Sequence, residues 1–166
     1  YDVLYNGVAY KGANWQEVTS AGAVLRFVDN DKDNRYDVLL ISDFKYVKVS
    51  AIDPVNGVIY GSKGYTLNMT DDNLDSEIID GETGELITVN DISQNDLLMV
   101  QSSLDGSYQR VEICAVSIIG QLTSSAPADH KIGIDGAEYT MDAAFEENTG
   151  FMPEIGKTYT FWIGAN

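Results

Sequence analysis

Four aspartates in one short segment carry side chains that could bind a metal ion. They are Asp29, Asp31, Asp33 and Asp37, at relative positions 1, 3, 5 and 9 of the segment. Calcium is a hard cation that takes about six to eight oxygen ligands at about 2.3–2.6 Å, and calcium loops supply ligands in this order. Four like charges this close repel one another unless a cation or water lies among them. The spacing predicts Ca²⁺ binding by the four carboxylates and the backbone carbonyl of Arg35.

The segment differs from a helix-loop-helix calcium site in the residues after its ninth position. The twelfth position is Leu40, which cannot supply a bidentate acid, and residues 38–41 form an apolar run typical of a buried strand. Asn34 holds the sixth position, where asparagine tolerates the left-handed conformation. The side chains of Lys32 and Arg35 are expected to point outward. The spacing resembles the calcium hairpins of β-propeller repeats in integrin-like proteins.

All of these ligands come from one local loop, so we expect the ion to have a structural role. A solvated acidic hairpin without metal is the alternative. Two further acidic stretches, residues 71–77 and 80–85, lack the strict alternation of the first segment. Asp142 with Glu146 and Glu147 offers still less. We interpret these as solvated loops.

Residues for catalysis are sparse. His130 is the only histidine and lies in a polar connection, so a Ser–His or Cys–His pair has no local support. Cys114 is the only cysteine and lies in an apolar run, which favours a buried, inert thiol. The 26 acidic residues permit a pair of carboxylates of the kind glycoside hydrolases use, but no spacing indicates one. We expect no enzymatic activity, with a hydrolase domain as the least favoured alternative.

Aromatic residues favour another alternative, a carbohydrate- or cell-wall-binding module. Trp15, Tyr10, Tyr60 and Tyr65 could form a platform on which sugar rings stack. Trp162 belongs to an alternating run in which every second residue must face a core, so core packing is its expected role. The platform would then depend on a single tryptophan.

Composition limits the expected partners. The 166 residues include 26 acidic and 10 basic side chains, for a formal charge of −16. This charge argues against nucleic acid and anionic membrane surfaces as partners. No apolar stretch approaches the roughly 20 residues of a membrane helix, so membrane insertion is not expected. The chain begins at Tyr1 without a methionine, and we expect it to be a fragment of a longer protein.

Apolar residues alternate in the manner of strands. The alternation runs through residues 47–52, 131–135 and 159–163. Dipeptides that tolerate positive φ separate the apolar runs at short intervals: Asn6-Gly7, Asn56-Gly57, Asp80-Gly81, Asp105-Gly106 and Asp135-Gly136. Short helical turns are expected only near residues 90–95 and 142–147. The predicted fold class is all-β.

An internal repeat relates two hairpins. Aligning Tyr36 with Tyr108 places residues 24–41 beside residues 96–113, and each segment reads as a strand, a polar turn and a second strand. The aspartate hairpin corresponds to an ordinary turn in the second copy, where Asp105 is the only acid. The first copy therefore resembles a hairpin whose turn has gained ligands.

Further copies suggest how the chain is divided. A third copy begins at Glu154 and stops at the chain end, and similar stretches at 49–60 and 116–136 precede the second and third copies. We predict two small β-barrel or sandwich units in tandem, built from repeated hairpins. They cover residues 1–113, which include the aspartate hairpin, and residues 114–166.

Four segments carry a family resemblance: 29–41, 98–113, 132–139 and 156–163. They resemble the β-rich modules that adjoin S-layer homology repeats in large secreted proteins of Gram-positive, clostridia-like bacteria. The resemblance implies an extracellular or cell-wall location, a spacer or adhesion role, and no known catalysis. Its implied partners are a cell-wall polymer or another surface protein. The predicted function is a non-catalytic module of a larger bacterial cell-surface protein with a structural calcium site, and the oligomeric state stays open.

Overall fold

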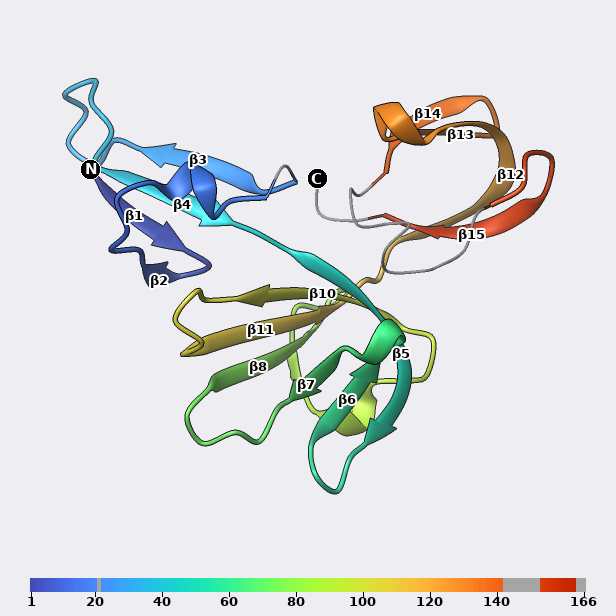
Figure 1. The fold of residues 1–166 in the computed structure, drawn as a ribbon, viewed down its shortest axis with the longest axis horizontal. Coiled ribbons are helices and arrows are strands. Elements are labelled where there is room, and N and C mark those ends of the chain that lie inside the picture. The colour runs from blue at the N-terminus through green and yellow to red at the C-terminus, as the bar shows by residue number, and fades with distance from the viewer. Residues whose placement is uncertain (21, 142–152, 164–166) are drawn as a thin grey trace.

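The chain folds into three β-sheets that follow one another along the sequence (Figure 1). The computed structural model describes residues 1–20, 22–141 and 153–163. Strands dominate these residues, and helix is limited to short 3-10 turns, which confirms the all-β class. The sheets are open, because the outermost strands have no partner on their far side among the described residues. Of the predicted barrel or sandwich units, the closed-barrel form is therefore excluded for these sheets.

The first sheet has a parallel pair at its centre. Its strands, in spatial order, are β2 (Val8–Ala9), β1 (Asp2–Tyr5), β4 (Val38–Ser42) and β3 (Val24–Val28). β1 runs parallel to β4, whereas β3 and β4 form the antiparallel hairpin that carries the aspartate segment. Tyr5, Leu39 and Ile41 form a small core, against which Tyr10 and Trp15 pack. This core holds the base of the hairpin in place.

The second sheet surrounds the larger core. Its strands, in spatial order, are β7 (Thr66–Asn68), β6 (Val58–Gly61), β5 (Lys45–Asp53), β10 (Leu97–Ser102), β11 (Tyr108–Ile113), β8 (Asp75–Asp80) and β9 (Leu86–Ile87). β8 and β11 are parallel, and the other neighbours are antiparallel. Ile59, Leu98 and Val111 are fully buried in its core. β4 leads almost directly into β5, which joins the first sheet to the second (Figure 1).

The third sheet is wholly antiparallel. Its strands are β14 (Ala137–Thr140), β13 (Lys131–Ile134), β12 (Ser117–Ala126) and β15 (Thr158–Trp162). In β15 the half-buried positions belong to Tyr159 and Phe161, and Trp162 is 41% exposed. The expected core packing of Trp162 was wrong, because the alternation has the opposite phase.

The strands of the first two sheets lie within residues 1–113, and those of the third lie within 114–166. That these two ranges are separate domains stays a prediction.

Short turns connect the strands. The 3-10 turns are η1 (Trp15–Glu17), η2 (Ser62–Gly64), η3 (Val89–Asp91) and η4 (Pro127–Asp129). η3 lies where a turn near residues 90–95 was predicted, and the turn predicted at 142–147 lies outside the described residues. Within the described ranges, no helix has the length and apolar character needed to cross a membrane.

Two of the predicted turn dipeptides form two-residue hairpin turns. Asn6 and Gly7 join β1 to β2 with φ of 46° and 84°, and Asp135 and Gly136 join β13 to β14 with φ of 50° and 84°. Such positive angles are what these tight turns require, and Asn, Asp and Gly tolerate them best. The other three dipeptides lie in longer connections between neighbouring strands.

The aligned hairpins β3–β4 and β10–β11 are both present, with a one-residue difference from the predicted alignment. Leu25 pairs with Ile41, whereas Ile113 pairs with Leu98 and not with its neighbour Leu97. β4 therefore matches β11 as predicted, and β3 matches β10 one residue further along. The aspartate turn is longer by that residue.

Candidate metal centre

The aspartate segment connects β3 to β4 and is fixed at its base. Val28 pairs with Val38, and the Asp37 backbone N–H donates to the Val28 carbonyl at 2.8 Å. The carbonyl of Asp37 accepts a hydrogen bond from the Asp2 N–H, also at 2.8 Å. The base of the loop is thus tied to β1 as well as to its own hairpin.

The first aspartate folds the loop around its own carboxylate. Asp29 Oδ1 accepts a hydrogen bond from the Lys32 N–H at 2.7 Å, and its Oδ2 accepts one from the Asn34 N–H at 3.0 Å. These two donors lie at left-handed residues, with φ of 64° for Lys32 and 67° for Asn34. Asparagine was expected to tolerate this conformation at position 34, whereas the left-handed conformation of Lys32 was not predicted.

The other aspartates make similar local contacts. Asp31 Oδ1 accepts from the Asp33 N–H at 3.1 Å, and Asp33 Oδ1 accepts from the Arg35 N–H at 2.8 Å. Asp37 Oδ2 accepts from the Asn30 N–H at 2.6 Å. Each of these three carboxylates has a second oxygen that accepts no hydrogen bond from the described part of the chain. The loop therefore supports its carboxylates and leaves oxygens open.

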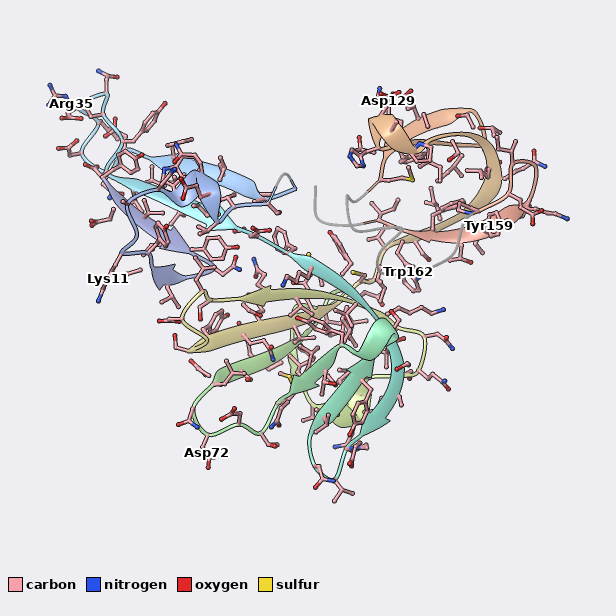
Figure 2. All side chains as sticks on the ribbon, viewed as in Figure 1. Lys11, Arg35, Asp72, Asp129, Tyr159 and Trp162 are labelled. Carbon is pink, nitrogen blue, oxygen red and sulfur yellow. The ribbon has the colours of Figure 1, made fainter. Side chains whose placement is uncertain are left out.

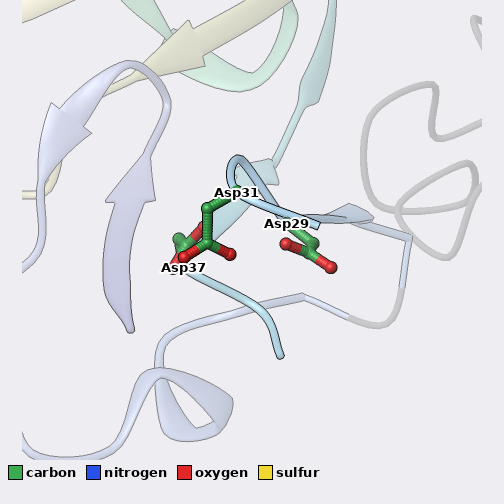
Figure 3. Close-up of side chains that lie close together, drawn as sticks. All are labelled: Asp29, Asp31 and Asp37. Carbon is green, nitrogen blue, oxygen red and sulfur yellow. The ribbon is translucent and has the colours of Figure 1, made fainter. Parts of the chain in front are cut away.

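Three of the five predicted ligand residues come together (Figure 3). Asp29, Asp31 and Asp37 each present a carboxylate oxygen, and these oxygens lie within 4.8 Å of one another. The carboxylate of Asp33 is not in this group, and Arg35 lies in the same exposed loop. The group joins the end of β3 to the start of β4, so an ion held there would bridge the two strands of the hairpin.

Within the described residues, no lysine or arginine forms an ion pair with this group. Among the described residues, neither Lys32 nor Arg35 forms an ion pair with a loop aspartate. Arg35 lies at the outer end of the hairpin, away from the sheets, as predicted (Figure 2). The donor set is all oxygen, which suits a hard cation such as Ca²⁺ or Mg²⁺.

The equivalent turn between β10 and β11 satisfies its acid internally. Asp105 Oδ1 accepts hydrogen bonds from the hydroxyls of Ser103 and Ser107, both at 2.7 Å. These bonds, with that from the Ser107 N–H, lower the pKa of Asp105 to about 2. Two serine hydroxyls thus stabilise a single carboxylate where the aspartate segment gathers three. Asp105 is the natural comparison for any test of metal binding.

The weaker acidic candidates that lie within the described residues do not form a similar group. Within the described residues, Asp29, Asp31 and Asp37 form the only cluster of three potential metal ligands. In the stretch 80–85, the N–H groups of Thr83 and Glu82 donate to Asp80 and lower its pKa. Asp142, Glu146 and Glu147 lie outside the described residues.

The candidate catalytic residues occupy different environments. Cys114 is buried, and burial raises its pKa to about 11, so its thiol stays protonated at neutral pH. His130 is exposed in the turn after η4, with φ of 53°. The burial predicted for Cys114 is confirmed.

The aromatic residues are divided among the three sheets. Trp15 and Tyr10 pack on the core of the first sheet, and Trp162 lies in the third. In the second sheet, Tyr65 packs against the core and Tyr60 is 41% exposed. These five residues therefore do not share one sheet face.

A hollow that no sequence pattern indicated lies between the first and second sheets. It has a volume of about 460 Å³. Tyr108, Arg110, Gln101 and Asp75 line it from the second sheet, and the turn at Asn6 lines it from the first. Asp75 is the only acid in this lining, so the hollow does not supply the two acids of a glycoside hydrolase. These residues come together only through strand pairing, which a single sequence does not reveal.

Comparison with known proteins gives no relative: no family model, no curated protein and no solved structure matches the chain.

Proposed function

We propose that this chain is a non-catalytic structural module of a larger bacterial cell-surface protein and that its aspartate hairpin binds one structural Ca²⁺. The observation that supports the ion is the convergence of carboxylate oxygens from Asp29, Asp31 and Asp37 within 4.8 Å. Asp33 and the carbonyl of Arg35 are the further ligands in this proposal. A divalent cation relieves the repulsion among these carboxylates, which no lysine or arginine of the described residues pairs with.

The ion acts on the hairpin as a whole. It holds Asp29, directly after β3, against Asp37, directly before β4, and Asp37 in turn holds β1 through Asp2. An affinity of about 10⁻⁴–10⁻³ M is common for extracellular calcium modules. When the free concentration of the ion is one to ten times its dissociation constant, an ion that binds only the folded chain stabilises it by about 0.4–1.4 kcal/mol.

The wider role rests on charge, repetition and resemblance. A formal charge of −16 suits a medium rich in cations, and the repeated hairpins suit a spacer built of similar units. The proposed location is extracellular or in the cell wall, as the resemblance to modules beside S-layer homology repeats implies. The proposed partners are a cell-wall polymer or another surface protein.

Thermal unfolding of the full chain at increasing Ca²⁺ tests the calcium proposal. The midpoint should rise with Ca²⁺ and fall again with a chelator, and Mg²⁺ should give a smaller rise because it prefers a stricter octahedral geometry. The rise should vanish in Asp31→Ala. Asp105→Ala, which removes an acid from the equivalent turn, should keep it. An unchanged midpoint in the parent chain, or an equal rise in both variants, would overturn the proposal.

The hollow between the first two sheets supports a second candidate, a carbohydrate- or cell-wall-binding module. The side chains of Gln101 and Asp75 line it and make no hydrogen bond to the described part of the chain. Amide and carboxylate groups beside an aromatic ring, here Tyr108, suit the hydroxyls and the apolar face of a sugar. Retention on insoluble glycan that Gln101→Ala abolishes would favour this candidate, and no retention of the parent chain would remove it.

A further inference from the structure

The third sheet repeats one side of the second sheet. β12 and β13 pair as β5 and β6 do, and each pair contains a register shift at one point. The shift lies between Val49 and Ala51 in β5, and between Leu122 and Ser124 in β12. β-bulges of this kind set the bend and twist of a strand. A shared bulge therefore indicates that β12 is the counterpart of β5.

The turns and the neighbouring strands agree with this match. Pro54 and Pro127 open the two turns, and Gly57 and His130 close them with φ of 65° and 53°. β5 pairs antiparallel with β10, and β12 pairs antiparallel with β15. The left-handed residues that precede β10 and β15 donate to equivalent carbonyls: Asn95 to Val49 at 2.9 Å, and Gly156 to Leu122 at 2.8 Å.

The first sheet repeats the other side of the second sheet. Its order β2-β1-β4-β3 corresponds to β9-β8-β11-β10, and both sets have a parallel pair in the middle. In chain order, a 3-10 turn lies between the second and third strands of each set: η1 between β2 and β3, and η3 between β9 and β10. The segments that lead into β3 and β10 also share a turn. The Ala23 N–H donates to the Ser20 carbonyl before β3, and the Asp96 N–H donates to the Ser93 carbonyl before β10, each at 3.2 Å.

β3 is thus the counterpart of β10, but it has one neighbour where β10 has two. β10 lies between β11 and β5, whereas β3 pairs with β4 alone among the described strands. Side chains at matching positions differ accordingly. Leu25 is 40% exposed where Leu98 is fully buried, and Phe27 is 44% exposed where Val100 is 2% exposed. In the second sheet, residues of β5, β6 and β7 complete the core around Leu98 and Val100.

We propose that the outer edge of β3 binds an antiparallel strand of the β5 type, with its following hairpin, as β10 binds β5. An open edge with exposed apolar side chains is a template for strand addition. The occupant is an extended segment with alternate apolar residues and a lysine near its start. In the second sheet Lys45 pairs with Val100, so the matching lysine lies opposite Phe27, two residues from Asp29. That position is electrostatically favourable beside the aspartate segment.

The proposal can be tested by supplying the missing strands to the whole protein. A second copy of residues 43–75, which carries β5, β6 and β7, is placed ahead of Tyr1 in the full chain. Hydrogen exchange of the β3 amides that point away from β4 should slow by about tenfold or more, because those amides gain partners. The protection should not depend on protein concentration, and Leu25 and Phe27 should become buried.

A matched variant separates specific pairing from mere attachment. Val47→Asp with Val49→Asp, introduced only in the added copy, should remove the protection of β3. A synthetic peptide of residues 45–53, added to the unmodified chain, should slow the same amides as its concentration rises.

Two outcomes would overturn the proposal. One is exchange at β3 that neither the added copy nor the peptide changes. The other is protection of β3 that grows with the concentration of the unmodified chain, because a second copy of the chain is then the occupant. The result does not depend on calcium, so failure here leaves the metal proposal standing.

Discussion

Asn6 and Asp43 hold each other at the junction of the first and second sheets. The Asp43 N–H donates to Asn6 Oδ1 at 2.8 Å, and Asn6 Nδ2 donates to the Asp43 carbonyl at 3.0 Å. The same amide donates to the Ser102 carbonyl at the end of β10, at 2.8 Å. Both Asn6 and Asp43 are buried. One side chain therefore joins the β1–β2 turn, the β4–β5 link and the second sheet.

Asn6→Ala should destabilise the chain by about 1–3 kcal/mol, because it leaves buried backbone groups without partners. Alanine is also strained at the φ of 46° that Asn6 adopts. Asn6→Gly accepts that angle, so the difference between the two variants measures the strain and the remaining loss measures the amide. Urea unfolding gives both values. Asn56→Ala, in an exposed turn, is the control, and equal losses at positions 6 and 56 would contradict the junction role.

Tyr108 makes the stability of the chain depend on alkaline pH. The Tyr108 hydroxyl donates a hydrogen bond to the Glu77 carboxylate at 2.6 Å. Burial and this carboxylate raise the pKa of Tyr108 from 10 to about 12. The folded chain therefore holds this proton more tightly than the unfolded chain, so the stabilisation is complete below pH 10 and is lost as the pH rises towards 12. Tyr108→Phe should flatten the decline of the unfolding free energy in this range. A decline of the same steepness in both proteins would assign it to other groups.

The pKa of Asp105 is shifted in the opposite direction to that of Tyr108, so its effect on stability appears at acidic pH. Its pKa is about 2 in the folded chain against an ordinary value of 3.8, so its stabilisation is present above that value and is lost as the pH falls towards 2. Asp105→Asn should reduce the loss of stability on acidification, measured by denaturant unfolding at several pH values. Asp72→Asn, which removes an acid from another exposed loop, is the control, and equal changes in both variants would contradict the role of Asp105.

The sequence predicted part of the local structure. Alternation of apolar residues identified strands at residues 47–52, 131–135 and 159–163, and Asn6-Gly7 and Asp135-Gly136 predicted the tight turns, because both signals depend only on near neighbours. The parallel pairing of β1 with β4, and of β8 with β11, was not predicted, since it joins segments that are far apart along the chain. The contact between Asn6 and Asp43 was missed for the same reason. The one-residue slip at β3 arose because the longer turn hid the true register.

The candidate site was predicted in part, for a similar reason. Asp29, Asp31 and Asp37 converge, and Asn34 is left-handed, because a short loop between paired strands is largely determined by its own residues. The position of Asp33 outside the group depends on rotations about single bonds that spacing does not specify. The lining of the hollow depends on how two sheets meet, so no local sequence pattern predicted that Gln101 and Arg110 would line it.

Asp31→Asn should change stability in opposite directions with and without calcium. The asparagine oxygen can still accept the Asp33 N–H, so the loop keeps its turn while one of three converging charges is lost. Without divalent ions the variant should melt above the parent chain. Its calcium affinity should fall by about tenfold or more, because each carboxylate contributes to the affinity of such sites. Calorimetric titration and thermal melts measure the two effects, and a variant that melts lower under both conditions would show that Asp31 acts through the turn alone.

Leu98 and Leu25 hold matching positions in β10 and β3, so truncating each measures what a covering strand contributes. Leu98 is fully buried, and Leu98→Ala should cost about 2–5 kcal/mol through lost burial and the cavity left behind. Leu25 is 40% exposed, and Leu25→Ala should cost less than about 1 kcal/mol, as expected of a site with little packing to lose. Urea unfolding of both variants gives the comparison. In the chain that carries an added copy of residues 43–75, the cost of Leu25→Ala should rise towards that of Leu98→Ala, because the edge of β3 is then covered. If the two truncations cost the same in the unmodified chain, then β3 is already covered in solution, which would contradict the open edge described for it.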